Sequence, residues 1–159
     1  YLGTTSLFIR RLMDAYDCTA AFHVYDSFAG LPEKGAADSS PAGEQFRAGE
    51  LTATTKDFTM NFKKAGLRLP HIHKAWFADL QPADLPERIS FAFLDGDYYD
   101  SITTSLHLIT PRLTAAAVIV VDDYVSDALP GSARAVDEWL RTQTAHLRVE
   151  QSLAIITLQ

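Results

Sequence analysis

Four apolar runs rich in β-branched or aromatic residues predict the strands of a sheet. They cover residues 20–25, 71–76, 90–94 and 115–121. The last two are apolar at successive positions, as strands are when helices cover both of their faces. We therefore expect these two strands to lie in the centre of a parallel sheet.

Segments with the apolar spacing of amphipathic helices lie between these runs. The first follows a candidate N-cap at Thr4, Thr5 or Ser6. A second covers residues 55–65 and is closed by Gly66 as a C-cap. The apolar positions that define the first, a third and a fourth helix are Phe8, Ile9, Leu12, Met13 and Tyr16, then Ile102, Leu106 and Ile109, then Val136, Trp139 and Leu140.

The alternation of strand and helix predicts an α/β fold with an open, doubly wound, mainly parallel Rossmann-like sheet. The C-terminal end departs from this pattern. Residues 147–149 and 153–158 are short β-type runs separated only by residues 150–152. Because so short a gap excludes a crossover helix, we expect a C-terminal antiparallel hairpin.

The pattern fits a single domain over residues 1–159. Within it, residues 29–50 are rich in Gly, Pro and Ser and lack periodicity, which indicates either a mobile loop covering a site or partial disorder. Such a sheet also needs a strand before Gly3, and none is visible in the sequence. We therefore expect that the first strand is missing and that further residues precede Tyr1 in the natural protein.

The composition excludes several classes of partner. Twenty acidic residues against fourteen basic ones give a formal charge of −6, which opposes binding to nucleic acid or to an anionic membrane. No apolar run approaches the ~20 residues of a membrane span. A single cysteine, Cys18, fits a reducing, cytoplasmic location.

Acidic residues follow three of the predicted strands. Asp26 follows the first, Asp95 and Asp97 the third, and Asp122 and Asp123 the fourth. A single Asp at such a point is usually a turn residue or a helix cap, which is the role expected for Asp100. The carboxyl ends of parallel strands converge, however, and grouped carboxylates repel one another and raise one another's pKa unless a cation neutralises them. Oxygen ligands of this kind favour Mg²⁺.

The acid after the first strand suggests a different role. In doubly wound sheets a carboxylate there commonly accepts hydrogen bonds from the ribose hydroxyls of a nucleoside. The segment Gly3-Thr4-Thr5-Ser6 would then form the turn that approaches the cofactor. The glycine signal is weak by itself.

Several segments together resemble the macrocin O-methyltransferase family of S-adenosylmethionine- and Mg²⁺-dependent sugar methyltransferases. The most specific are Asp-Ser-Phe-Ala-Gly-Leu-Pro at 26–32 and Asp-Gly-Asp-Tyr-Tyr at 95–99. Further matches occur at 74–80, at 121–124 and at 130–137, and the resemblance runs from about Gly3 to Leu140.

The resemblance implies the class I methyltransferase fold, a hydroxylated small-molecule acceptor such as a glycoside, and association into homo-oligomers. It assigns Asp95, Asp122 and Asp123 to the metal. It places the cofactor S-adenosylmethionine at Gly3, Thr4, Thr5, Asp26, Ser27, Trp76, Phe77 and Asp79. Ala75 and Ala116 depart from the family pattern, where glycines are usual.

The reaction that follows from these assignments is attack of an acceptor hydroxyl on the sulfonium methyl group. Mg²⁺ would activate and orient the hydroxyl, and Asp95 would accept its proton. In the related catechol methyltransferases a lysine three residues after the first metal acid is the base, whereas Tyr98 stands at that position here. A tyrosine would need a strongly lowered pKa for this role.

The histidines are interpreted as structural. His71 and His73 share one face of a predicted strand at metal-like spacing but lie near its beginning, and His23 lies within the first strand. A histidine acting as a base across a dimer contact remains an alternative. His107 and His146 lie on a helix and near the C-terminal hairpin.

Three other functions are compatible with parts of the pattern. Asp95-Gly96-Asp97 could be the metal motif of a glycosyltransferase, although Asp26 and Asp122-Asp123 then lack a role. A phosphotransfer pocket would need a lysine at a later strand end, and no lysine follows Lys74. A non-catalytic remnant of the methyltransferase fold is the third. The sequence does not identify the acceptor.

Overall fold

The computed structural model describes residues 2–44 and 46–159 and divides the chain into two compact units. The first unit comprises Tyr1–Pro32 and Ala48–Asp79, and the second comprises Glu33–Arg47 and Leu80–Gln159. Tyr1 and Gln45, which belong to the domain and the loop predicted from the sequence, lie outside the described residues. The single domain over residues 1–159 stays a prediction, and each unit is described by itself.

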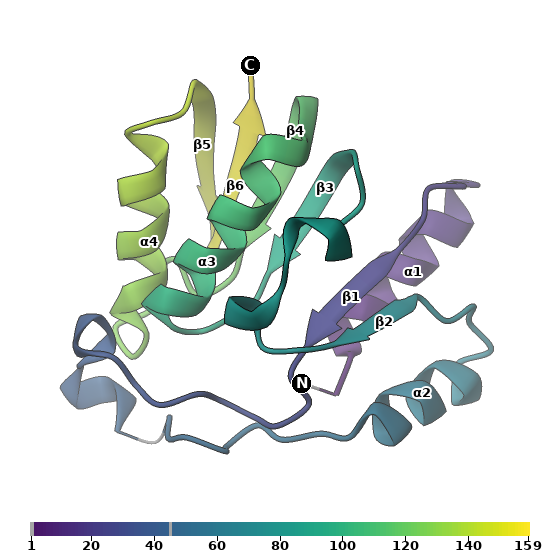
Figure 1. Ribbon diagram of the computed structural model, residues 1–159, viewed down its shortest axis with the longest axis horizontal. Helices are drawn as coiled ribbons and strands as arrows, with labels where there is room; N and C mark the ends of the chain where they lie inside the picture. Colours follow the sequence, from purple (N-terminus) through teal and green to yellow (C-terminus); the bar gives the residue numbers. More distant parts are fainter. Residues whose placement is uncertain (1, 45) are drawn as a thin grey trace. The chain divides into compact units, whose positions relative to one another are not determined.

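The first unit is built around two parallel strands, β1 (His23–Asp26) and β2 (His71–Lys74). Helices α1 (Thr4–Ala15) and α2 (Thr55–Lys64) complete it (Figure 1). Val24 and Ile72, which share one face of the strand pair, pack against a core of aromatic rings. The core contains Phe28, Phe58 and Phe62, with Leu7, Phe22, Val24, Leu67 and Ile72 packed against it.

The ends of α2 follow the predicted signals. Thr54 caps the first turn, and its side chain and that of Asp57 form a reciprocal capping box. After the last turn Gly66 takes a φ of 67°, and its N–H donates to the carbonyl of Lys63. The helix predicted over residues 55–65 and its glycine stop are thus confirmed.

Helix α1 differs from its prediction in two ways. Because the helix already begins at Thr4, its N-cap is Gly3, which has no side chain to form a capping hydrogen bond. The expected cap by Thr4, Thr5 or Ser6 is therefore wrong. Three residues of the predicted apolar stripe are also exposed, Phe8 by 60%, Leu12 by 59% and Tyr16 by 81%.

The second unit contains a four-stranded sheet in the order β3-β4-β6-β5. Strands β3 (Ile89–Leu94) and β4 (Leu113–Val121) are parallel, and β6 (Leu153–Leu158) pairs antiparallel with both β4 and β5 (Ala145–Glu150). The prediction of a parallel sheet that ends in an antiparallel hairpin is confirmed. Strand β3 is an edge strand in this sheet, so its expected central position is not found among the described residues.

Helices α3 (Tyr99–Ile109) and α4 (Pro130–Leu140) pack together over one face of this sheet (Figure 1). The predicted inward residues Ile102, Leu106, Val136 and Trp139 are buried. The expectation that helices cover both faces of β3 is wrong for the described chain, since Phe91 is 47% exposed. Successive apolar positions reveal a strand but do not show what covers each face.

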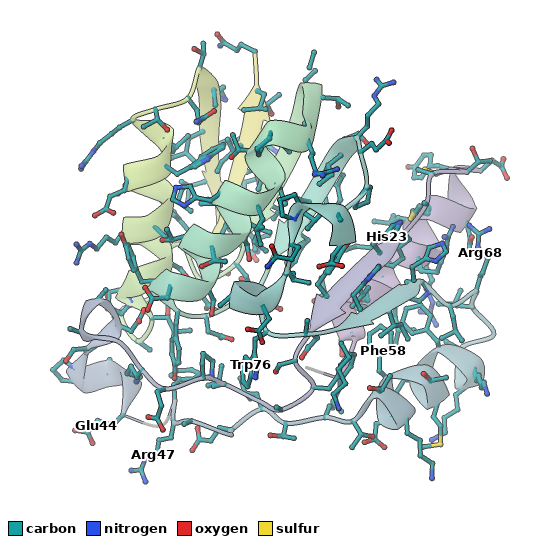
Figure 2. All side chains as sticks on the ribbon, viewed as in Figure 1. His23, Glu44, Arg47, Phe58, Arg68 and Trp76 are labelled. Atoms are coloured by element: carbon teal, nitrogen blue, oxygen red, sulfur yellow. The ribbon has the colours of Figure 1, made fainter. Side chains whose placement is uncertain are left out.

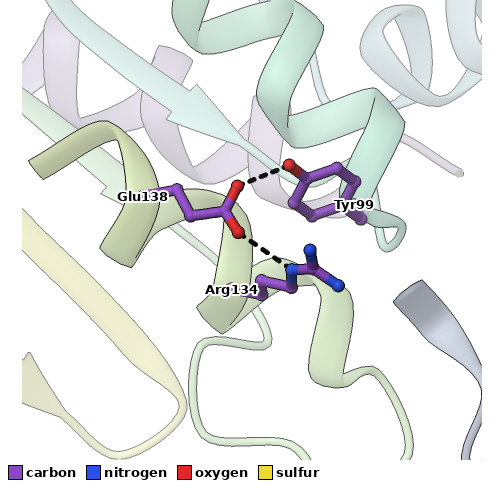
Figure 3. A network of polar contacts seen from close by, with 3 residues as sticks. All are labelled: Tyr99, Arg134 and Glu138. Atoms are coloured by element: carbon purple, nitrogen blue, oxygen red, sulfur yellow. Dashed lines mark hydrogen bonds and ion pairs between the residues drawn. The ribbon is translucent and has the colours of Figure 1, made fainter.

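A polar network joins the two helices of the second unit (Figure 3). The Tyr99 hydroxyl donates to Glu138 Oε2 at 2.5 Å, and Arg134 Nε donates to Glu138 Oε1 at 2.9 Å. These hydrogen bonds lower the pKa of Glu138. The Arg134 guanidinium lies 5.0 Å from the centroid of the Tyr99 ring. The network fixes the register of α4 against the first turn of α3.

Residues 29–50 are divided between the units. In the first unit, Leu31 and Glu50 are joined by a backbone hydrogen bond of 2.9 Å. In the second, the loop forms two short 3₁₀ helices, Ala36–Asp38 and Pro41–Gly43. Asp38 is 1% exposed, and its Oδ1 accepts from the N–H of Tyr99 at 2.7 Å. A buried carboxylate therefore anchors this part of the loop to α3.

Three other 3₁₀ turns connect the main elements, at Phe77–Asp79, Pro82–Asp84 and Thr110–Arg112. Within residues 2–44 and 46–159, every helix is too short or too polar to cross a bilayer.

Candidate active site

Three carboxylates of the second unit come together after β3 and β4. One oxygen atom from each of Asp95, Asp97 and Asp123 lies within 4.8 Å of the others. Asp95 is exposed, and the other two are partly buried. The predicted convergence of acids from the Asp-Gly-Asp and Asp-Asp segments is therefore present in the structure.

Backbone geometry at the two strand ends produces this cluster. The N–H of Asp122 donates to the carbonyl of Leu94 at 2.9 Å, which holds the ends of β3 and β4 level. Directly after this bond, Asp97 and Asp123 adopt left-handed conformations, with φ of 60° and 56°. Aspartate tolerates this region better than most residues. These two turns direct their side chains toward Asp95.

The cluster is electrostatically unfavourable without a cation. Burial, followed by repulsion from Asp95 and Asp123, raises the pKa of Asp97 to about 7. Burial and the charges of Asp122 and Asp95 raise the pKa of Asp123 to about 6. A bound divalent ion would reverse this effect by favouring the ionised carboxylates. Oxygen-only ligands at this spacing fit Mg²⁺.

Asp122, which was predicted as a metal ligand, lies beside the cluster. Its Oδ1 accepts hydrogen bonds from the N–H of Asp123 at 2.9 Å and from Ser152 Oγ at 3.2 Å. Asp97 takes the third place in the cluster instead. The sequence signal for Asp97 was its position two residues after Asp95, across the buried Gly96.

Tyr98 stands where a related methyltransferase has a lysine base, but its environment is structural. The side chain is 1% exposed. Its hydroxyl donates to the carbonyl of Phe46 at 3.1 Å, and Lys34 Nζ lies 5.8 Å from its ring centroid. Tyr98 therefore ties residues 33–47 to the start of α3.

The residues predicted to bind the cofactor belong to the first unit. Gly3 begins α1 with a φ of 81°, and a Cβ atom there would lie 2.6 Å from the ring of Phe58. Phe58 also packs edge-on against Phe28, at 5.9 Å between ring centroids. The start of α1 and the turn after β1 thus meet on one aromatic ring. The first turn, with Thr4 and Thr5, has no side-chain cap, so its N–H groups are available to an anion.

The turn after β1 is held by its own side chains. Asp26 Oδ1 accepts from the N–H of Phe28 at 2.7 Å, and Ser27 Oγ accepts from the N–H of Ala29 at 3.1 Å. Phe28 takes a left-handed φ of 53°. The N–H of Phe28 therefore gives Oδ1 of Asp26 a hydrogen-bond partner within the turn, without a cofactor. Binding of ribose by Asp26 and Ser27 stays a prediction.

The third segment predicted to border the cofactor follows β2. The N–H of Ala75 donates to the carbonyl of Asp26 at 3.0 Å, which joins this segment to the end of β1. Trp76 is 39% exposed, and Phe77 and Asp79 begin and end a 3₁₀ turn. An exposed indole beside the end of β1 could stack on a planar base.

Two similar proteins are O-methyltransferases according to their names. The 8-demethyl-8-(2,3-dimethoxy-alpha-L-rhamnosyl)-tetracenomycin-C 4'-O-methyltransferase of Streptomyces olivaceus is 35% identical over 133 residues, covering 79% of this chain and 51% of that protein. The mycinamicin III 3''-O-methyltransferase of Micromonospora griseorubida is 29% identical over 146 residues, covering 86% and 56% respectively. The chain thus spans about half the length of these curated relatives.

Solved structures show the same fold. The O-methyltransferase NovP superposes with a TM-score of 0.83 at 22% identity, covering the whole of this chain and 69% of that one. The calicheamicin methyltransferase CalS11 gives 0.81 at 19% identity, covering 98% and 68%. The predicted class I methyltransferase fold is confirmed. The sequence model of the macrocin O-methyltransferase (TylF) family matches residues 1–153, and the chain belongs to this family.

Proposed function

We propose that this protein is an S-adenosylmethionine- and Mg²⁺-dependent O-methyltransferase that methylates a hydroxyl group of a sugar. The observation that carries the proposal is the carboxylate cluster of Asp95, Asp97 and Asp123 in a chain of the macrocin O-methyltransferase family. The cofactors give the reaction its chemistry: S-adenosylmethionine supplies the methyl group, and Mg²⁺ lowers the pKa of a hydroxyl that it binds.

The carboxylates have two functions in this proposal, to bind the metal and to accept a proton. Asp95 and Asp123 bind the metal, and the third carboxylate ligand is either Asp97 or Asp122. Asp97 is favoured by its place in the cluster, whereas Oδ1 of Asp122 is already engaged by two donors. Asp95, the most exposed member, accepts the proton released by the acceptor hydroxyl, because an exposed carboxylate can pass it on to water.

The first unit holds the cofactor. The N–H groups of the uncapped first turn at Gly3, Thr4 and Thr5 would bind the carboxylate of the methionine part. Asp26 and Ser27, at the end of β1, accept hydrogen bonds from the ribose. Trp76 and Phe77 contact the adenine ring, and Asp79 lies at the end of the same turn.

The acceptor class comes from the relative of Streptomyces olivaceus, whose name describes a rhamnosyl group on tetracenomycin C. A glycoside with two adjacent hydroxyls is the substrate class we assign to this protein. Exposed Cys18, free of any disulfide, is in keeping with a cytoplasmic location. Homo-oligomerisation, which the family resemblance implies, belongs to the same proposal.

The test is methyl transfer from labelled S-adenosylmethionine to a panel of rhamnosides and catechols, with the full-length protein. We expect turnover of glycosides that is lost with EDTA and restored by Mg²⁺. Turnover that persists in EDTA would contradict metal dependence. Binding of S-adenosylhomocysteine without turnover on any acceptor would instead support a non-catalytic remnant, and binding of a nucleotide sugar would support a glycosyltransferase.

Two matched variants identify the third metal ligand. Asp97→Asn and Asp122→Asn each replace a carboxylate with a neutral amide of the same shape, so that one oxygen becomes an NH₂ group. Mn²⁺ binding measured by calorimetry should weaken more in Asp97→Asn. If it weakens only in Asp122→Asn, the ligand set expected from the family resemblance is the correct one.

A further inference from the structure

Three histidines and a tyrosine form a column of rings on one face of the β1–β2 pair. The parallel register places His23 opposite His71 and Tyr25 opposite His73, so all four side chains share a face. The His23 and His71 rings stack at 4.7 Å between centroids, and those of Tyr25 and His73 at 4.4 Å. These residues belong neither to the carboxylate cluster nor to the predicted cofactor site.

The column lies on the side of the strand pair away from the aromatic core. Val24 and Ile72, which alternate with the histidines along β1 and β2, are the residues that pack on Phe58 and its neighbours. Figure 2 shows His23 on β1 and Phe58 on α2. His71 is exposed, and His23 is partly buried. The imidazoles therefore have a separate environment from the packed core.

Two imidazole nitrogens already face each other within the column. His23 Nδ1 lies 3.0 Å from His73 Nε2. In a neutral pair one ring donates its only N–H to the lone pair of the other, so a single proton lies between two potential ligands. Two nitrogens bound to one tetrahedral Zn²⁺ lie roughly 3.3 Å apart, given bond lengths of about 2.0–2.1 Å. For a metal ion to bind both nitrogens, the shared proton moves to the other nitrogen of its own ring, and the rings turn so that both lone pairs point at the ion.

Among the described residues only the carboxylate cluster has three ligand atoms within 4.8 Å of one another, so His71 must turn to become the third ligand of this pair. Its ring stacks on His23, and it lies two residues before His73 on the same face of β2. Joining the pair requires a change in its side-chain torsions, which an exposed side chain makes readily. Three histidines with one position left for water form a common zinc arrangement.

We propose that His23, His71 and His73 form a binding site for a divalent transition-metal ion of the zinc class, distinct from the carboxylate cluster. Imidazole ligands favour zinc, copper and nickel, whereas carboxylates favour Mg²⁺. The ligands come from both strands, so a bound ion joins β1 to β2 and stabilises the first unit. This inference is independent of the proposed methyl transfer.

The test is calorimetric titration with Zn²⁺ in an excess of Mg²⁺, which occupies the carboxylates. We expect one Zn²⁺ per wild-type chain and a rise in the melting temperature with Zn²⁺. In His23→Gln and His73→Gln, Zn²⁺ should bind about tenfold more weakly or worse, and the rise in melting temperature should disappear. Co²⁺ titrated into the wild type should show the visible absorption of a tetrahedral nitrogen site.

Matched controls separate this site from other ligands. His107→Gln and His146→Gln replace exposed histidines outside the column and should leave Zn²⁺ affinity unchanged, as should Asp95→Asn. If His23→Gln and His73→Gln fail to fold, the exposed His71→Gln decides, and its Zn²⁺ affinity must fall. A wild type that does not bind Zn²⁺, or binding that survives all three column variants, overturns the proposal.

Discussion

The two groups of potential metal ligands in this chain are built in opposite ways. Carboxylates gather after the ends of β3 and β4, where left-handed turns at Asp97 and Asp123 direct them together. The imidazoles lie within β1 and β2, where the register alone stacks His23, His71 and His73 in extended backbone.

The groups also differ in how they are stabilised without an ion. Burial, followed by repulsion among the carboxylates, raises the pKa of Asp97 to about 7. The imidazoles satisfy one another, since His23 and His73 share a hydrogen bond and the rings stack. A cluster that lowers the stability of the fold unless a cation binds supports the proposed metal site, whereas a cluster whose members bond to one another can be stable either empty or filled.

The largest effect is expected from removing one carboxylate of the cluster. Asp95→Asn should lower methyl transfer by roughly 100-fold or more, because metal activation contributes several kcal/mol to the transition state. Steady-state rates at saturating cofactor measure the loss. His146→Gln, an exposed change outside both groups, should keep the wild-type rate. An Asp95→Asn enzyme of normal activity would exclude a metal at this position.

The next effect concerns the cofactor residues near the column, at the end of β1. Asp26→Ala should weaken S-adenosylhomocysteine binding by about 1.5–3 kcal/mol, the range for hydrogen bonds to a charged group. Calorimetry gives the affinity. Asp26→Asn is the matched control for the turn, since its amide oxygen can still accept from the N–H of Phe28. Unchanged affinity in Asp26→Ala would place the ribose elsewhere.

A smaller effect is the pH dependence of stability that the crowded carboxylates, unlike the imidazoles, should cause. The pKa of Asp97 rises from 3.8 when unfolded to about 7 when folded, so the folded state holds a proton that the unfolded state releases in this window. The free energy of unfolding of the metal-free protein should therefore fall as pH rises from about 4 to 7, by on the order of 1 kcal/mol, and then level off.

Urea denaturation at pH 5 and pH 8, in EDTA, measures this dependence. Asp123, whose pKa is raised to about 6, contributes with the same sign. Asp97→Asn keeps the shape and tolerates the left-handed backbone, so it should reduce the difference between the two pH values. An equal difference in wild type and variant would show that the cluster does not repel itself as described.

The smallest effect lies in β4, the strand that precedes Asp122 and Asp123. Ala116 has a φ of 57°, in an irregular stretch of the β3–β4 pairing. This explains why the usual family residue there, as the resemblance indicated, is glycine. Ala116→Gly should raise the free energy of unfolding by about 1 kcal/mol, since alanine pays roughly 1–2 kcal/mol in this region.

Thermal denaturation measures this gain, expected as roughly 2–4 °C for a chain of this size. Ala117→Gly is the matched control, because Ala117 is buried and has ordinary backbone. It should lower the melting temperature. A destabilised Ala116→Gly variant would show that the irregular stretch is not strained.

Much of the fold followed from local patterns. The 3.6-residue spacing predicted α3 and α4 with their buried residues Ile102 and Trp139, and the three-residue gap predicted the final hairpin. These features depend on neighbours in sequence, which the pattern records. The exposed stripe of α1 and the edge position of β3 depend on what packs beside them, and the pattern does not contain that information.

The same division holds for the two groups of ligands. The sequence by itself determined that acids follow the predicted strands and that His71 and His73 share a face, because strand ends and a two-residue period are local properties. Only the tertiary structure decided that Asp97 rather than Asp122 joins Asp95, and that His23 meets His73. Both outcomes depend on turns and register that bring together residues far apart in the chain.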